Sequence, residues 1–89
     1  MKNLSDNADL YRFLLEIEHT LRRGGSDKLA EAVKTASRHA AGMSTEFLGE
    51  SRIALREVFK AGVNALGEKD LSNVADVLRQ LDEALERRR

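Results

Sequence analysis

Three short polar breaks, each containing glycine, divide this chain of 89 residues into four segments. The breaks are Gly24-Gly25-Ser26, Gly42-Met43-Ser44 and Gly67-Glu68-Lys69-Asp70. In each break, a glycine that tolerates the left-handed conformation is followed by Ser or Asp, whose side chains accept a hydrogen bond at a helix start. This punctuation predicts four helices. We expect them over residues 6–23, 27–41, 45–66 and 71–88.

The apolar residues recur with a helical period in every segment, and no stretch shows the alternation typical of a strand. The fourth segment is the clearest, because its apolar residues alternate steps of three and four. These residues are Leu71, Val74, Leu78, Leu81 and Leu85. Connections of three or four residues make consecutive helices antiparallel neighbours. We therefore expect an all-α protein, with residues 1–89 forming a single domain, an up-down-up-down four-helix bundle.

The second and third predicted helices differ in length. At ~1.5 Å per residue, residues 27–41 span about 22 Å and residues 45–66 about 33 Å. Two arrangements accommodate this difference in length. The third helix bends at Gly49 or Gly62, or its end overhangs the bundle and contacts another subunit.

Composition excludes several classes of protein. Fifteen basic side chains balance fifteen acidic ones, so the chain lacks the positive charge expected of a nucleic-acid-binding surface. Without cysteine, it has no disulfide, thiolate nucleophile or cysteine-ligated metal. No apolar run reaches the ~7 to 15 residues of a signal-peptide core or the ~18 to 20 of a membrane span. These features predict a cytoplasmic protein with no membrane partner.

Four apolar residues fall outside the predicted core stripes. Tyr11 and Leu15 form an i,i+4 pair on a second face of the first helix, Ile53 lies nearly opposite the core face of the third helix, and Val63 lies at its margin. A chain of this size buries only about 60 to 65% of its unfolded surface, so a partner adds needed stability. We expect these four residues to contact another protein, in the simplest case a second copy in a homodimer.

Patterns for catalysis or metal binding are sparse. Glu16 and His19 have a Glu-x-x-His spacing, but the di-metal bundles that use this spacing need it twice. We expect this pair to lie on a solvated face. The chain also lacks a serine flanked by glycines and a phosphate-binding glycine loop. The sequence therefore predicts no catalytic, cofactor-binding or metal-binding residue, no enzymatic activity and no small-molecule substrate.

The chain ends in the basic run Arg87, Arg88 and Arg89. Positive charge at a helix C-terminus complements the helix dipole, which explains the run without a binding role. The same arginines in a short tail can contact phosphate groups or an acidic partner. Nucleic-acid association through this tail is thus an alternative function.

His39 is followed by Ala40, Ala41, Gly42 and, further on, Gly49. This pattern resembles histidine-phosphotransfer domains, four-helix bundles in which a lysine, a glycine and a second glycine follow an exposed histidine. The resemblance covers residues 39–49, and it departs from the family because the lysine is missing and Gly42 comes one residue early. It implies phosphoryl transfer at His39 as a third interpretation.

The favoured interpretation is a non-catalytic protein–protein interaction module that works by packing helix faces. Small regulators, adaptors and subunits of larger assemblies share these features.

Overall fold

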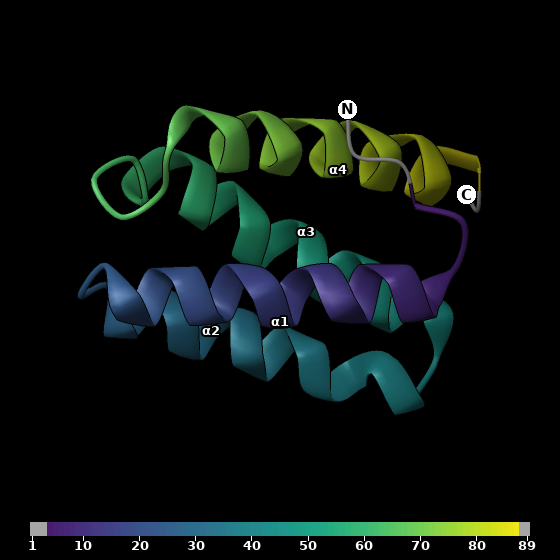
Figure 1. Cartoon of the computed structure of the whole chain (residues 1–89). Coiled ribbons are helices and arrows are strands. Elements are labelled where there is room, and N and C mark those ends of the chain that lie inside the picture. Colours follow the sequence, from purple (N-terminus) through teal and green to yellow (C-terminus); the bar gives the residue numbers. More distant parts are fainter. Residues whose placement is uncertain (1–3, 88–89) are drawn as a thin grey trace.

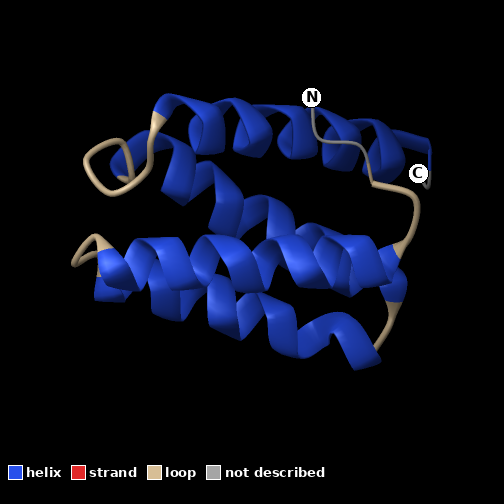
Figure 2. Cartoon of the chain, viewed as in Figure 1, coloured by secondary structure: helices blue, strands red, loops and turns tan. Residues whose placement is uncertain are grey.

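The computed structural model describes residues 4–87, and these residues form helices and connections without a strand (Figure 2). The α-helices are α1 (Asn7–Arg23), α2 (Asp27–Ser37), α3 (Ser44–Ala61) and α4 (Glu68–Arg87). A single 3₁₀ turn, Arg38–Ala41, continues α2. The prediction of an all-helical protein with four helices is confirmed. Within the described residues, none of the helices combines the length and apolar composition that a membrane crossing requires.

Each helix packs along the next one in the chain, and the chain reverses direction at every connection (Figure 1). The molecule is compact, with a Cα radius of gyration of 11.9 Å. The backbones of α1 and α4 lie farther apart than those of consecutive helices. Side chains fill the space between them.

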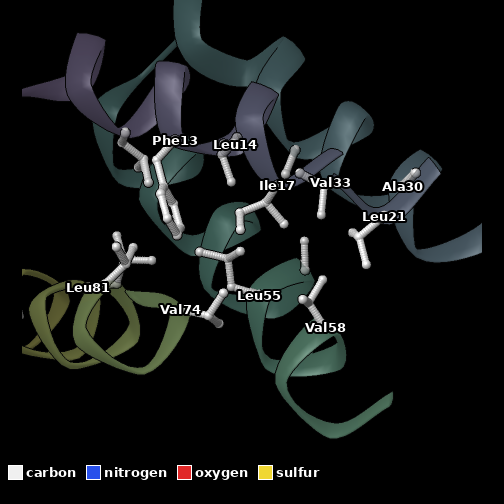
Figure 3. Close-up of a cluster of buried hydrophobic side chains, with 14 of the residues drawn as sticks. Phe13, Leu14, Ile17, Leu21, Ala30, Val33, Leu55, Val58, Val74 and Leu81 are labelled. Carbon is white, nitrogen blue, oxygen red and sulfur yellow. The ribbon is translucent and has the colours of Figure 1, made fainter. Parts of the chain in front are cut away.

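The buried apolar side chains of all four helices form one cluster. Figure 3 shows Phe13 of α1, Leu55 of α3 and Leu81 of α4 pointing into the same space. The apolar residues that recur at helical spacing along α1 predict one core stripe, and that stripe is fully buried. It consists of Leu10, Phe13, Leu14, Ile17 and Leu21.

The face of α4 that is buried differs from the predicted face by a rotation about the helix axis. The structure buries Val74, Val77 and Leu81, whereas the remaining leucines of the stripe are only half-buried. These are Leu71, Leu78 and Leu85. Phe59 follows Leu55 by four residues, a spacing that predicts a core position, yet Phe59 is 48% exposed.

The start of α1 is fixed by reciprocal hydrogen bonds. The Asp6 carboxylate accepts the Asp9 N–H at 2.9 Å, which satisfies a donor that the helix leaves open. The Asp9 carboxylate accepts the Ser5 hydroxyl and the Ser5 N–H, and it pairs with Arg12. These interactions lower the pKa of Asp9 to about 2. The hydrogen bond from the Ser5 hydroxyl has the largest effect, followed by the bond from the Ser5 N–H and then by Arg12.

Residues 4–6, the N-terminal arm, cross from α1 onto α4. The Leu4 N–H donates to Gln80 Oε1 at 2.8 Å, and the Leu4 side chain packs against the core. A cleft of about 190 Å³ lies beneath the arm. Its lining includes Leu10, Leu48 and Ala84. The arm thus covers the seam between α1 and α4.

The connection from α1 to α2 has the predicted helix bounds, and Ser26 is the N-cap of α2, but the Ser26 side chain does not accept the predicted cap hydrogen bond. Gly25 takes the left-handed conformation (φ 84°), and its N–H donates to the Arg22 carbonyl while the Ser26 N–H donates to the Leu21 carbonyl. This is the Schellman arrangement, which glycine favours. Gly24 lies against the α3–α4 connection: a Cβ on Gly24 would be 2.7 Å from the Ala65 Cβ.

The helix ends differ from those predicted at the other two connections. The helix α3 is continuous through Gly49 and ends at Ala61, not at residue 66. The Gly62 carbonyl accepts the N–H groups of both Ala65 and Leu66, and the resulting turn places the Leu66 side chain in the core. Once the chain has turned there, α4 begins at residue 68 instead of 71.

The second predicted helix also ends early, because the chain tightens into the 3₁₀ turn after Ser37. The Ser37 hydroxyl donates to the Lys34 carbonyl at 2.6 Å, a local bond that competes with the α-helical pattern. The next helix has Met43 at its N-cap, not a serine. Ser44 instead accepts a hydrogen bond from the Asn7 side chain at 3.0 Å.

Candidate interaction surface

The apolar residues predicted to contact a partner are all exposed. The exposed fractions are 40% for Tyr11, 40% for Leu15, 59% for Ile53 and 58% for Val63. The sequence pattern missed Met43, which is 72% exposed in the α2–α3 connection. The structure does not gather these side chains on a single surface.

Tyr11 and Leu15 belong to a ridge along α1. The residues Tyr11, Leu15, Glu18 and Arg22 recur at i, i+4, i+7 and i+11, which places them on one face of the helix. We call these four residues the α1 ridge. Its first two members are apolar and its last two are charged.

The α1 ridge borders α2. The Arg22 guanidinium donates to Glu18 and to Glu31 of α2, both at 3.1 Å. Both hydrogen bonds raise the pKa of Arg22, and the bond to Glu18 has the larger effect. The ion pairs fix the charged end of the ridge, while its apolar end is open to solvent.

Two further polar residues lie beside Leu15, on the side of α1 away from α2. Arg12 and His19 are both exposed, and they lie three residues before and four residues after Leu15. The Arg12 side chain is 64% exposed, although it also pairs with Asp9. The apolar part of the ridge therefore has a basic residue and an imidazole along its outer edge.

A second surface lies between α2 and α3. Here the side chains leave a groove of about 270 Å³. Its lining consists of Ala32, Thr35, Ala36, Glu50, Ile53, Ala54 and Glu57. We call it the α2–α3 groove. Its small α2 residues leave Ile53 projecting at one wall, so Ile53 belongs to this groove and not to the α1 ridge.

The α3 wall of the groove is acidic. Glu50 and Glu57 are exposed and lie three residues before and four residues after Ile53. Within residues 4–87, neither carboxylate forms a salt bridge, whereas the opposite side of α3 carries Arg52 and Arg56 bound to Asp82 of α4. The helix α3 thus separates its charges, with carboxylates toward α2 and guanidinium groups toward α4.

Val63 lies far from the apolar end of the α1 ridge. It is in the α3–α4 connection, which meets the end of α1 through the contact between Gly24 and Ala65. Tyr11 lies twelve residues before the end of α1, about 18 Å along the helix. Tyr11 and Val63 therefore belong to different ends of the molecule.

The residues considered for other chemistry lie apart. His39 is in the 3₁₀ turn, and its Nδ1 is 3.0 Å from a carboxylate oxygen of Glu46. Glu16 and His19 are exposed on α1. In the described part of the chain, His, Asp and Glu side chains do not gather in groups of three close enough to hold a metal ion.

The basic C-terminal run is described only at Arg87. This side chain is 81% exposed and 4.0 Å from Glu83. Arg88 and Arg89 lie outside the described residues. Two candidate surfaces with exposed apolar residues are thus present among the described residues, the α1 ridge and the α2–α3 groove. The chain matches no protein-family model, no curated protein and no solved structure.

Proposed function

We propose that this protein acts by binding another protein chain through the α1 ridge, and that its simplest partner is a second copy of itself. The observation that carries this proposal is the pair Tyr11 and Leu15, each 40% exposed on one helix face. Such a module suits a small regulator, an adaptor or a subunit of a larger assembly.

The chemistry of the pair favours a protein partner. Burying a fully exposed leucine contributes about 1.5 to 3 kcal/mol, so covering the 40% of Leu15 that is exposed adds roughly 1 kcal/mol. Tyrosine adds apolar area with a polar tip, a combination enriched in protein interfaces. The neighbouring charges of both signs, Arg12, Glu18 and Arg22, supply a polar rim that sets the register of a contact.

The interior of the bundle supports a binding role over catalysis. Among the described residues, Ser37 and Ser51 are the buried polar side chains, and all other buried side chains are apolar. A binding module needs a stable scaffold and an exposed contact, and this distribution provides both.

The proposal is tested by measuring the association state of Leu15→Glu by sedimentation equilibrium over a range of concentrations. Loss of the leucine contact, together with the cost of burying the new carboxylate, weakens self-association at least about tenfold. Ser72→Glu is the control, because it makes the same change in charge at an exposed residue of α4, a helix that contributes to neither candidate surface. Far-UV circular dichroism verifies that both variants stay helical.

Two results count against the proposal. A wild-type chain that is monomeric at all concentrations excludes the second copy as the partner. Equal weakening by Leu15→Glu and Ser72→Glu shows that added charge, and not the α1 ridge, controls association.

A further inference from the structure

The polar residues that flank Leu15 of the α1 ridge and Ile53 of the α2–α3 groove have the same spacing, and they are donors on α1 and carboxylates on α3. On α1, Leu15 has Arg12 three residues before it and His19 four residues after it. On α3, Ile53 has Glu50 and Glu57 at the same two offsets. Both polar pairs are seven residues apart, about 10.5 Å along a helix, so their spacings coincide.

We infer that the α1 ridge of one copy docks antiparallel on the α3 wall of the α2–α3 groove of a second copy, with Leu15 against Ile53. This inference rests on the proposed function and names the surface that receives the ridge. In this arrangement Arg12 faces Glu57 and His19 faces Glu50 of the other copy.

Helix geometry selects the antiparallel direction. At about 100° per residue, the residues at offsets −3 and +4 lie about 60° and 40° to the same side of the central apolar residue. Two facing antiparallel helices bring equivalent sides together, whereas two parallel helices bring opposite sides together. Both polar pairs therefore meet only when α1 runs antiparallel to α3.

Pairing each surface with its own kind gives poorer chemistry. Two α1 helices packed antiparallel around Leu15 place Arg12 opposite His19, so Arg12 keeps its own partner Asp9 and gains no carboxylate from the other copy. Two α3 walls packed around Ile53 place Glu50 opposite Glu57, and like charges repel. Only the contact between ridge and groove places each exposed carboxylate of α3 beside a hydrogen-bond donor, the Arg12 guanidinium or the His19 imidazole.

The apolar contact supplies most of the affinity, and the polar pairs select the partner surface. Since the two contacting surfaces differ, one copy has both a free ridge and a free groove. Association then gives either a reciprocal pair or a longer head-to-tail assembly.

The decisive experiment mixes two variants. Leu15→Glu removes the ridge and keeps the groove, while Ile53→Glu removes the groove and keeps the ridge. We expect each variant alone to self-associate at least about tenfold more weakly than the wild type. An equimolar mixture recovers association as a one-to-one complex, because one intact ridge meets one intact groove. Sedimentation equilibrium with one variant carrying a mass tag measures that complex.

A charge exchange provides a second test that does not alter an apolar residue. Arg12→Glu and Glu57→Arg each weaken self-association several-fold, and a chain carrying both changes recovers part of the loss. Glu86→Arg is the control, because it makes the same change in charge as Glu57→Arg at an exposed residue of α4. This pair keeps the inference testable if Ile53→Glu fails to fold.

The possible results separate this inference from the proposed function. If Ile53→Glu self-associates like the wild type while Leu15→Glu is impaired, the groove does not receive the ridge and this inference fails, but the proposed function of the α1 ridge still stands. If Leu15→Glu self-associates like the wild type, both proposals fail. If both variants are impaired and their mixture shows no complex, the ridge does not enter the groove, and the inference is overturned.

Discussion

The contact between the two connections at one end of the bundle predicts the effect of Gly24→Ala. A Cβ at this position would lie 2.7 Å from the Ala65 Cβ and 2.9 Å from the Ala65 Cα. The backbone of Gly24 has a φ of −84°, which alanine adopts without strain. Any destabilisation therefore comes from the collision between the two connections and not from backbone conformation.

The size of the effect follows from the atoms that collide. Inserting a methyl group into a packed site costs about 1 to 3 kcal/mol. Here the neighbours are the Cβ and the backbone of Ala65, which cannot rotate away as a flexible side-chain end does. We expect a loss of about 2 to 3 kcal/mol, equivalent to a fall in Tm of roughly 10 to 20 °C for a chain of this size.

Urea unfolding followed by circular dichroism measures this loss, and Gly49→Ala is the matched control. Gly49 lies inside α3, and a Cβ there meets no other atom within 4 Å. Because alanine is the better helix former, Gly49→Ala raises stability by about 0.5 to 1 kcal/mol. Both changes restrict the unfolded chain similarly, so their difference reports the contact. If Gly24→Ala proves as stable as Gly49→Ala, the two connections do not touch as described.

Three further predictions concern single polar groups. The Ser51 hydroxyl is buried and has no hydrogen-bond partner among residues 4–87. Urea titrations of Ser51→Ala should therefore give a free energy of unfolding that is about 1 to 2 kcal/mol higher than that of the wild type. A lower free energy of unfolding contradicts this prediction. The pKa of Asp9 is lowered from 3.8 to about 2 in the folded chain, so its stabilising effect is complete above about pH 4 and is lost as the pH falls toward 2. Urea midpoints across this interval therefore fall less in Asp9→Asn than in the wild type; parallel curves refute the assignment. Gln80→Met removes the acceptor of the Leu4 N–H and lowers stability by about 0.5 to 1.5 kcal/mol in the same assay; an unchanged midpoint contradicts a contribution from that bond.

The helices of this chain were predictable because the glycine breaks and the apolar periods agree. The stripe of α1 is buried as predicted, and the offset of Tyr11 and Leu15 from that stripe agrees with their 40% exposure. These are local properties that a single helix determines. The end of α3 was not predictable, because the chain turns after Ala61 and thereby places Leu66 in a core that other helices form.

The rotation of α4 and the α2–α3 groove depend on tertiary packing. In the sequence, Leu78 and Phe59 have the spacing of core residues, yet the structure leaves both partly exposed. One signal was available: Phe59 follows Arg52 and Arg56 at offsets of seven and three, which places it on the basic side of α3. The groove itself requires the small residues of α2 to face Ile53, a register that no single helix shows.

The hydrogen bond from Leu4 to Gln80 has a consequence for the order in which the chain folds on the ribosome. It joins residues 76 positions apart, so the arm has no acceptor until α4 has been synthesised. The earlier contacts, α1 with α2 and α2 with α3, join neighbours in sequence and form while synthesis continues. A nascent chain that has reached only α3 therefore exposes the apolar surface that α4 later covers. Such exposed apolar surface makes an unfinished bundle prone to aggregation until α4 packs against it.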